Sequence, residues 1–266
     1  MKYWFVGLML GLTAIFTLTP MPSVAQTPAR PPYTPPRTPD GQPDLQGIWQ
    51  VLSTASWDVE GSTPSLGVPA GHGVVEGGLI PYQPAALAKK KDNFARRATL
   101  DPETKCLLPG IPRMTYMPYP FQIVQQASKV TILYEYRRFL RRIHMDGLPH
   151  PEGHIDFWLG DSRGRFEGNT LVVDVIHFND KTWFDRAGNF HSDELHVVER
   201  YTPTGPDHML YEVTIEDPKT FTRPWKMSMP LYRRQGQEAE LLEYQCAAYV
   251  LDNEWDNPAS TYFQQR

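Results

Sequence analysis

Hydrophobic and polar residues alternate along much of the second half of the chain, which is the pattern of β-strands that bury one face. The alternation is clearest over residues 209–216, where one face holds Met209, Tyr211, Val213 and Ile215. Together with an earlier strand near the start, this pattern predicts about nine strands. They are Leu45–Val51, Phe121–Ala127, Val130–Met145, Phe157–Leu159, Thr170–Phe178, Leu195–Tyr201, Met209–Glu216, Trp225–Tyr232 and Glu240–Val250.

The stretch over residues 158–174, WLGDSRGRFEGNTLVVD, is typical of a hairpin. Turn-forming residues stand between runs of strand-forming residues, and this is a strong local signal for a strand pair. We predict an aromatic-rich strand first and a turn centred on Gly160–Gly164. Gly168-Asn169 then leads into the strand Leu171–Val175.

The region before the main strands has a different character. Residues 53–82 are rich in Gly, Ser and Pro and predict a long loop, whereas Pro84–Arg97 predicts a helix with proline near its start. Because the connections after residue 121 are short, we predict one all-β domain over residues 45–266. It would be an antiparallel up-and-down barrel of lipocalin-like type with one N-terminal helix. The alternative is a two-sheet β-sandwich.

The N-terminus has the features of a secretory signal peptide. Lys2 precedes an apolar run over residues 3–18, and Ser23-Val24-Ala25 offers a small-residue cleavage site. We therefore predict a signal peptide over residues 1–25, a proline-rich linker over 26–44, and a periplasmic or secreted protein. A membrane anchor is the alternative, but Thr19-Pro20 interrupts the apolar run.

Charge and cysteine content narrow the possible partners. The formal net charge of −4, with both signs mixed, argues against a nucleic-acid partner and against docking on an anionic membrane. Export would place Cys106 and Cys246 where a disulfide persists, and we predict that they pair. Two buried free thiols are the alternative. The sequence does not define an oligomeric state.

Two resemblances add expectations. Gly47-Ile48-Trp49 resembles the first strand of lipocalins, in which the Trp closes one end of the barrel under a basic side chain. The block from Cys106 onward resembles an uncharacterised group of secreted bacterial proteins, which implies export and a single domain but no activity. Its matching segments are PGIPR (109–113), PYPFQ (118–122), WLGDS (158–162), GRFEG (164–168), FNDKTW (178–183) and HSDELH (191–196).

A polar loop between two strong strand predictions is the leading candidate for chemistry. Loops at a barrel mouth commonly present functional groups, and histidine beside a carboxylate suits proton transfer near neutral pH. A hydrogen-bonded turn without chemistry is the alternative. The candidate catalytic residues here and in the following strand are Asp180, Asp185, His191, Glu194, His196 and Glu199.

The inward face of the strand Leu195–Tyr201 stays open at this point. If His196 and Arg200 point inward, Arg200 could bind an anionic or carbonyl group. If Glu199 points inward, it becomes the candidate base, and a buried charge of this kind requires a partner or a ligand. The candidate ligand-binding residues are Trp183, Arg200, Tyr134 and Tyr211.

A third cluster raises the question of a metal. Residues 144–156 contain His144, His150 and His154 together with two aspartates, and imidazole and carboxylate suit a divalent metal. Asp146-Gly147 and Pro149 instead favour an ordinary turn, and no established metal-site spacing is present. We therefore expect no cofactor, with a divalent metal as the alternative.

These observations lead to three functional hypotheses. The first is an exported barrel that binds a small, largely apolar molecule and performs acid-base chemistry on it, as an isomerase, lyase or hydrolase. The second is a binding protein without turnover, and the third is a metal-dependent enzyme that uses His144, His150 or His154. The motifs of serine hydrolases, zincin proteases, P-loop proteins and dinucleotide-binding enzymes are absent from the sequence.

Overall fold

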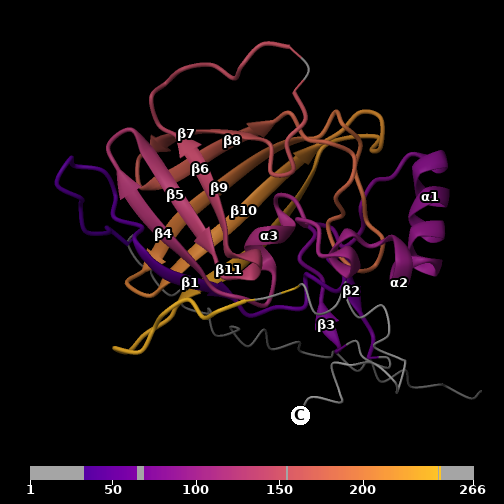
Figure 1. Ribbon diagram of the computed structural model, residues 1–266, viewed down its shortest axis with the longest axis horizontal. Helices are drawn as coiled ribbons and strands as arrows, with labels where there is room; N and C mark the ends of the chain where they lie inside the picture. The colour runs from indigo at the N-terminus through magenta and orange to yellow at the C-terminus, as the bar shows by residue number, and fades with distance from the viewer. Residues whose placement is uncertain (1–32, 65–68, 154, 245, 247–266) are drawn as a thin grey trace, which may run out of the picture. The chain divides into compact units, whose positions relative to one another are not determined.

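The computed structural model describes residues 33–64, 69–153, 155–244 and 246 (Figure 1). The predicted signal peptide and the start of the linker lie outside these residues. The described chain forms a closed barrel of nine strands in the order β1-β11-β10-β9-β8-β7-β6-β5-β4, in which β4 returns to β1. This confirms the all-β barrel with an N-terminal helix, in place of the alternative sandwich.

The barrel strands are β1 (Gly47–Val51), β4 (Phe121–Gln126), β5 (Lys129–Tyr134), β6 (Phe139–His144), β7 (Asp161–Glu167), β8 (Thr170–Ile176), β9 (His196–Gly205), β10 (His208–Glu216) and β11 (Trp225–Arg233). A separate two-stranded sheet pairs β2 (Gly61–Ser62) with β3 (Gly71–His72). The helices are α1 (Pro84–Ala95), α2 (Arg97–Leu100) and α3 (Arg113–Tyr116), and the 3-10 turns are η1 (Pro102–Lys105) and η2 (Tyr136–Arg138).

The hairpin at residues 158–174 forms, but its turn is not where we predicted it. Gly160 precedes β7, and Gly164 lies within that strand, so these residues do not form the turn. Gly168-Asn169 connects β7 to β8, and the backbone φ of Gly168 is +61°. A two-residue turn with positive φ matches the twist of the flanking strands, which explains why Gly-Asn takes this position.

Three other strand predictions need correction. The segment 130–145 is broken into β5 and β6 by η2, where Arg137 and Arg138 take φ values of +63° and +48° and reverse the chain. Phe157–Leu159 forms only an isolated bridge from Phe157 to Phe178. Of the predicted strand Glu240–Val250, residues 240–244 contain no strand, and residues 245 and 247–250 lie outside the described residues. Several of the apolar residues that suggested these strands lie at the surface, among them Phe139, Leu140, Phe157 and Leu242.

Strands β6 and β7 depart from the predicted antiparallel pattern, because they run parallel and are joined by the long segment 145–160. The other neighbouring pairs in the barrel are antiparallel. The register between β6 and β7 consists of the single pair His144 and Arg163, whereas β10 and β11 are matched over most of their length. The β6–β7 seam is therefore a weakly paired junction of the barrel.

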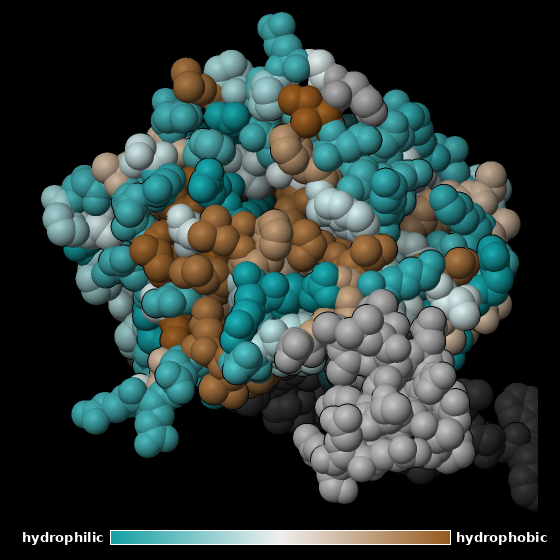
Figure 2. Space-filling model, viewed as in Figure 1, coloured by the Kyte–Doolittle hydropathy of each residue, from teal (hydrophilic) through white to brown (hydrophobic). Residues whose placement is uncertain are grey.

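Large side chains pack inside the barrel. Among those that are almost fully buried are Trp49, Phe121, Tyr201 and Tyr211. At one end Trp49 donates its indole N–H to the carbonyl of Leu45 at 3.0 Å, and the guanidinium of Arg233 lies 4.2 Å from its ring centroid. Arg233 thus supplies a basic side chain above the Trp. Figure 2 shows apolar side chains in a band across the front of the molecule, bordered by hydrophilic ones.

The predicted disulfide between Cys106 and Cys246 is present, which confirms that pairing. It joins the region before the main strands to the segment after β11. No helix within the described ranges has the length and apolar character needed to span a bilayer.

Candidate functional site

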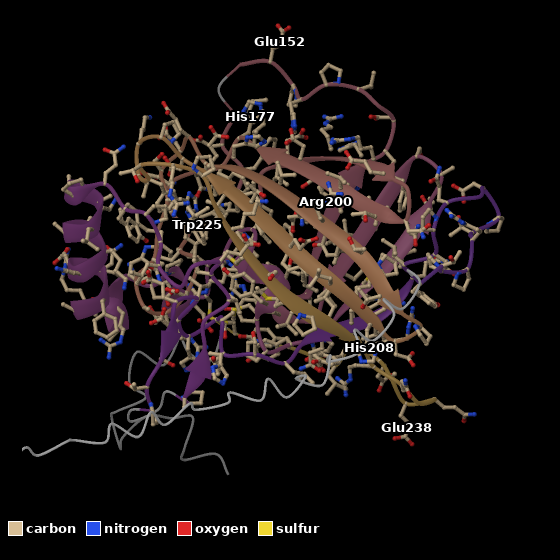
Figure 3. All side chains as sticks on the ribbon, turned by 180° about the vertical axis from the view of Figure 1, so that it is seen from behind. Glu152, His177, Arg200, His208, Trp225 and Glu238 are labelled. Atoms are coloured by element: carbon tan, nitrogen blue, oxygen red, sulfur yellow. A yellow bond between two sulfur atoms is a disulfide. The ribbon has the colours of Figure 1, made fainter. Side chains whose placement is uncertain are left out.

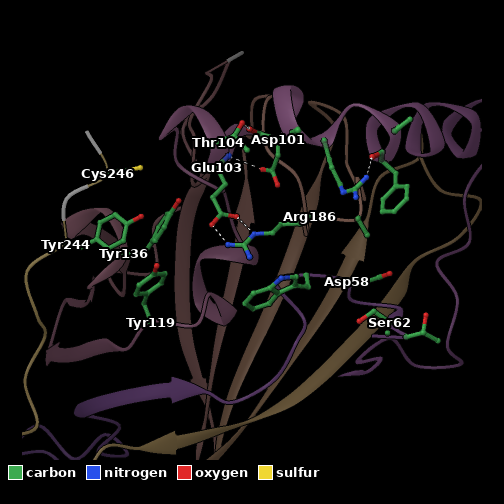
Figure 4. A pocket seen from close by; sticks show the side chains of 18 residues that line it. Asp58, Ser62, Asp101, Glu103, Thr104, Tyr119, Tyr136, Arg186, Tyr244 and Cys246 are labelled. Atoms are coloured by element: carbon green, nitrogen blue, oxygen red, sulfur yellow. Dashed lines mark hydrogen bonds and ion pairs between the residues drawn. The ribbon is translucent and has the colours of Figure 1, made fainter. Parts of the chain in front are cut away.

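A cleft of about 990 Å³ lies outside the barrel interior, among the segments around α1, α2 and η1 (Figure 4). Its volume is in the range of small-molecule sites. The lining residues come from segments that are far apart in the sequence. The aromatic and charged side chains discussed below form much of its two walls. They are Trp57, Asp58, Glu103, Tyr119, Tyr136, Arg186 and Tyr244.

Three tyrosine rings form one wall of the cleft. Tyr136 lies in η2, Tyr119 precedes β4, and Tyr244 follows β11. The ring centroids of Tyr119 and Tyr136 are 5.3 Å apart, and Tyr244 lies 5.2 Å from the first and 4.9 Å from the second. The disulfide of Cys246 fixes the chain two residues after Tyr244. Figure 4 shows the three rings gathered at one side of the cleft.

Two arginines and two acids form a hydrogen-bonded network beside this wall. Arg113, which is fully buried, donates to both carboxylate oxygens of Asp101 at 2.8 and 2.9 Å and to Glu103 at 2.7 Å. Arg186 donates to the two oxygens of Glu103 at 2.7 and 2.6 Å. Burial alone would raise the pKa of Glu103, but the hydrogen bonds and charges of Arg186 and Arg113 outweigh it and lower that pKa. Glu103 is therefore ionised, and the network sets two guanidinium groups against two carboxyl groups.

Local backbone structure places Glu103 in this network. The Asp101 side chain accepts the N–H of Glu103 at 2.9 Å and so caps η1, which has proline at its start. This is the usual role of an aspartate at a helix N-cap. The Asp101 carboxylate therefore caps η1 and also binds Arg113 of α3. These contacts together hold η1 against α3.

The other wall of the cleft carries an aromatic ring and a second carboxylate. The guanidinium carbon of Arg186 lies 4.5 Å from the ring centroid of Trp57, so the arginine is held by a cation–π contact as well as by Glu103. Asp58 follows Trp57, and its Oδ1 accepts the N–H of Glu60 at 2.9 Å. Partial burial raises the pKa of Asp58.

Asp185 holds the segments behind the cleft together. Its carboxylate accepts backbone N–H groups of Val59, Ala187 and Asn189 at 2.9, 2.9 and 3.2 Å, and the Asn189 side-chain amide at 2.6 Å. The residue is fully buried, and burial followed by the charge of Asp58 raises its pKa to about 7. The structure thus places this predicted catalytic residue behind the wall of the cleft.

The other residues predicted in the 180–196 loop do not converge on one point. His191 is buried, its Nε2 lies 2.6 Å from the Thr182 hydroxyl, and burial lowers its pKa. Trp183 packs with Ala86 and Phe190 in a small separate cluster. Asp180 and Glu194 are exposed, and Glu194 pairs with Lys219 at 3.1 Å.

The predicted residues of β9 lie on opposite sides of the barrel wall. His196 and Arg200 are on the outside, where they contact Asp174 and Glu167 at 2.6 and 2.9 Å. Figure 3 shows Arg200 on the outer side of the strands. Glu199 points inward with the buried Val197 and is paired with Arg141. The inward charge therefore has the partner that its burial requires.

Two candidate ligand-binding tyrosines lie in the same interior cluster. The hydroxyl of Tyr211 donates to Glu199 at 2.7 Å, and the hydroxyl of Tyr134 lies 3.2 Å from that of Thr115. Both tyrosines are buried. The structure brings Tyr134, Tyr211 and Glu199 together, and separates them from Arg200 and Trp183.

The histidines of the metal hypothesis are spread out. His144 lies 3.9 Å from Asp146, whereas His150 contacts Asp161 and Asp174. His154 lies outside the described residues. Within the part of the chain that the structure describes, no group of three or more metal-binding side chains has the arrangement to hold an ion.

The cleft was missed in the sequence because its lining residues come from segments that are far apart in the chain and share no local motif. One signal did point to it, since the predicted disulfide requires Tyr244 to lie near the region of Glu103. Comparison with family models, curated proteins and solved structures finds no significant match to this chain. The case for function therefore depends on the cleft itself.

Proposed function

We propose that this protein binds a small, uncharged molecule with planar rings in the cleft, and that the tyrosine wall is the main contact. The observation that carries the proposal is the packing of Tyr119, Tyr136 and Tyr244 beside a charge-balanced ionic network. Ligand sites are mostly apolar with a few well-placed polar groups, and aromatic rings contact flat ligands over a large area.

The charge of the network supports an uncharged ligand. Arg113 and Arg186 balance Asp101 and Glu103, so a charged ligand would find these four groups already paired. The Arg186 guanidinium, which uses two of its nitrogens on Glu103, can still offer a hydrogen bond at the edge of a ring. The interior of the barrel is the less favoured location, because Trp49, Tyr201 and Tyr211 are packed into it.

A neutral aromatic dye tests the binding proposal. N-phenyl-1-naphthylamine gains fluorescence when it leaves water, and its dissociation constant is measured by titration into the native protein and into Tyr244→Ala. Loss of one ring contact of about 1 kcal/mol weakens binding by about fivefold. The matched control is Phe157→Ala, which removes an exposed ring outside the cleft.

The dye experiment distinguishes the cleft from the barrel interior. Weaker binding in Tyr244→Ala, with native affinity in Phe157→Ala, supports the cleft. Equal affinity in all three proteins, or no saturable binding to the native protein, contradicts the proposal. Tyr211→Phe tests the interior, because it removes a hydroxyl next to Glu199 without touching the cleft.

Acid-base turnover of the bound molecule is the second candidate function, and Asp58 favours it. Asp58 lines the cleft, and burial raises the pKa of its carboxyl, which is the direction of shift expected for a carboxyl that acts as a general acid or base. The test uses the molecule that native mass spectrometry finds on the purified protein. Conversion by the native protein and not by Asp58→Asn supports turnover, and recovery of the unchanged molecule from both supports binding alone.

Export is part of the same proposal. The disulfide is compatible with an oxidising compartment, and such bonds are rare in the cytosol. Fractionation of expressing cells followed by N-terminal sequencing tests it. A mature chain that begins at Gln26 in the periplasm or medium supports export, and an intact N-terminus in the cytosol contradicts it.

A further inference from the structure

A histidine joins a surface segment to the outer wall of the barrel. His150 belongs to the segment 145–153, which follows β6. Its Nδ1 lies 2.7 Å from Oδ2 of Asp161 on β7, and its Nε2 lies 2.9 Å from Oδ2 of Asp174 on β8. Figure 3 shows Glu152 at the tip of the arch that this part of the chain forms beyond the strands. The imidazole therefore bridges two carboxylates on neighbouring strands.

A second histidine shares one of these carboxylates. Nε2 of His196, the first residue of β9, lies 2.6 Å from the other oxygen of Asp174. Its Nδ1 faces Glu216 of β10 at 3.9 Å. Asp174 is thus held between two imidazoles that come from different parts of the chain.

Acidic and basic side chains surround His150 and His196, so the hydrogen bonds of this cluster depend on the protonation of the two imidazoles. Arg163 donates to Asp161 at 2.7 Å and lies 3.7 Å from Asp146, whose other oxygen is 3.9 Å from His144. The ring of His177 lies 6.3 Å from that of His150, and its Nε2 contacts the carbonyl of Pro151 at 2.9 Å. The acids facing the cluster are Asp146, Asp161, Asp174 and Glu216, and Arg163 is the permanent cation among these partners.

The number of N–H donors decides how the cluster responds to pH. An ionised carboxylate only accepts hydrogen bonds, and a neutral imidazole has one N–H, whereas an imidazolium has two. His150 can donate to Asp161 and Asp174 together only when both ring nitrogens carry protons. When it loses a proton, one of these bonds is lost and the two carboxylates repel each other across the ring.

The electrostatics of His196 agree with this geometry. The hydrogen bond with Asp174 raises the pKa of His196, and the same bond lowers the pKa of Asp174. A histidine whose folded-state pKa is raised stabilises the fold below its ordinary pKa, and this contribution is lost as the pH rises through the folded value. The contact therefore weakens in the alkaline direction.

We propose that His150 and His196 form a pH-operated latch that holds the segment 145–153 on the outer wall of the barrel. The latch is closed when both imidazoles are protonated and opens when they become neutral. Asp161, which His150 contacts, lies on β7, and the register of β7 with β6 is the single pair His144 and Arg163, so the latch joins the segment to a strand at the weakly paired seam. The latch does not depend on what the cleft binds.

Hydrogen–deuterium exchange of the full protein at pH 5.5 and pH 8.5 tests the latch. After correction for the intrinsic effect of pH on exchange, we expect the protection of amides in 145–153 to fall by about tenfold at pH 8.5, which corresponds to the loss of one charge-assisted hydrogen bond. Peptides from β10 serve as the internal reference. In His150→Gln the pH dependence of this segment is lost, because glutamine does not titrate.

His208→Gln is the matched control, since His208 lies on β10 against Tyr232 and outside the latch. It keeps the native pH dependence. Equal corrected protection at the two pH values in the native protein, or an unchanged pH dependence in His150→Gln, overturns the proposal. If His150→Gln does not fold, the rings of His150 and His196 and the amides of 145–153 are titrated by NMR in the native protein. Amides in this segment that do not change over the same pH range as the two rings also overturn the proposal.

Discussion

Arg141 and Glu199 face each other inside the barrel across a sequence separation of 58 residues. Arg141 on β6 pairs with both carboxylate oxygens of Glu199 on β9, and Glu199 also accepts the hydroxyls of Tyr201 and Tyr211 at 3.0 and 2.7 Å. Nε of Arg141 donates to Ser162 of β7 at 3.0 Å, so the arginine also spans the β6–β7 seam. These side-chain contacts therefore help to hold β6 and β7 together, where the backbone register consists of one residue pair.

Removal of one partner from this buried pair should destabilise the barrel strongly. Glu199→Leu leaves the Arg141 guanidinium buried without its counter-ion, and we expect a loss of about 4 kcal/mol in the free energy of unfolding. The double variant Arg141→Met with Glu199→Leu should recover much of this loss, because no charge stays buried. Urea denaturation measures both, and a double variant no more stable than the single one contradicts the interpretation.

The same strand shows how far the sequence can be interpreted. The alternation in β9 identified two faces correctly, but each face held both apolar and charged residues, so the inward one could not be chosen. The choice is made by Arg141, which lies on a distant strand and gives Glu199 a partner. The barrel class followed from local alternation and short connections, whereas the parallel β6–β7 pair depends on where the long segment 145–160 returns.

Asp185 should give the protein a distinctive pH dependence. Because its folded-state pKa of about 7 lies above the ordinary 3.8, its stabilisation is complete below about pH 4 and is lost as the pH rises through 7. The stability advantage of the native protein over Asp185→Asn should therefore shrink by about 4 kcal/mol between pH 4 and pH 8. Urea titrations across this range measure it.

The matched control for this experiment is Asp180→Asn, since Asp180 is exposed in the same loop. Its difference from the native protein should be small and should not follow the titration of Asp185. A constant difference between Asp185→Asn and the native protein at all pH values would show that Asp185 stays ionised in the fold.

The charge balance of the cleft leads to a prediction about ligand selectivity. Glu103→Gln leaves Arg113 and Arg186 against Asp101, so the cleft gains one positive charge. We expect the affinity for the anionic dye 8-anilinonaphthalene-1-sulfonate to rise by about fivefold relative to the neutral dye, about 1 kcal/mol for one partly screened charge. Fluorescence titrations with both dyes measure the ratio, and an unchanged ratio places the dye elsewhere.

The disulfide should stabilise both the fold and the tyrosine wall. It closes a loop with a sequence separation of 140, and the chain-entropy relation assigns about 5 kcal/mol to such a link. The double variant Cys106→Ser with Cys246→Ser should lose stability of this order in urea. Because Tyr244 would no longer be tethered, it should also bind the neutral dye more weakly under conditions where it is folded.

Native affinity for the dye in the folded double variant would mean that Tyr244 reaches the tyrosine wall without the disulfide.

The cleft could be anticipated from the sequence only in part. The pairing of Cys106 with Cys246 was predictable from an even cysteine count and a predicted export signal, but the three tyrosines carry no shared spacing. The three tyrosine rings are brought together by η2, by the segment that precedes β4 and by the disulfide.

Gly47 has a role that the Gly-x-Trp pattern alone does not explain. Its φ is +132°, and a Cβ at this position would lie 2.1 Å from Nη1 of Arg233, the side chain that covers Trp49. Gly47→Ala should therefore strain the backbone and displace Arg233, at a cost of about 2 kcal/mol. Gly41→Ala is the matched control, because Gly41 also has a positive φ but has nothing within 4 Å of the added Cβ.

A double-variant cycle with Arg233→Ala separates the two contributions to this cost. Without the Arg233 side chain the clash is removed, so Gly47→Ala should cost only its backbone strain, similar to the cost at Gly41. If Gly47→Ala costs the same whether or not Arg233 is present, the glycine serves the backbone alone. A reduced cost in the Arg233→Ala background would instead show that Gly47 keeps space for the cation above Trp49.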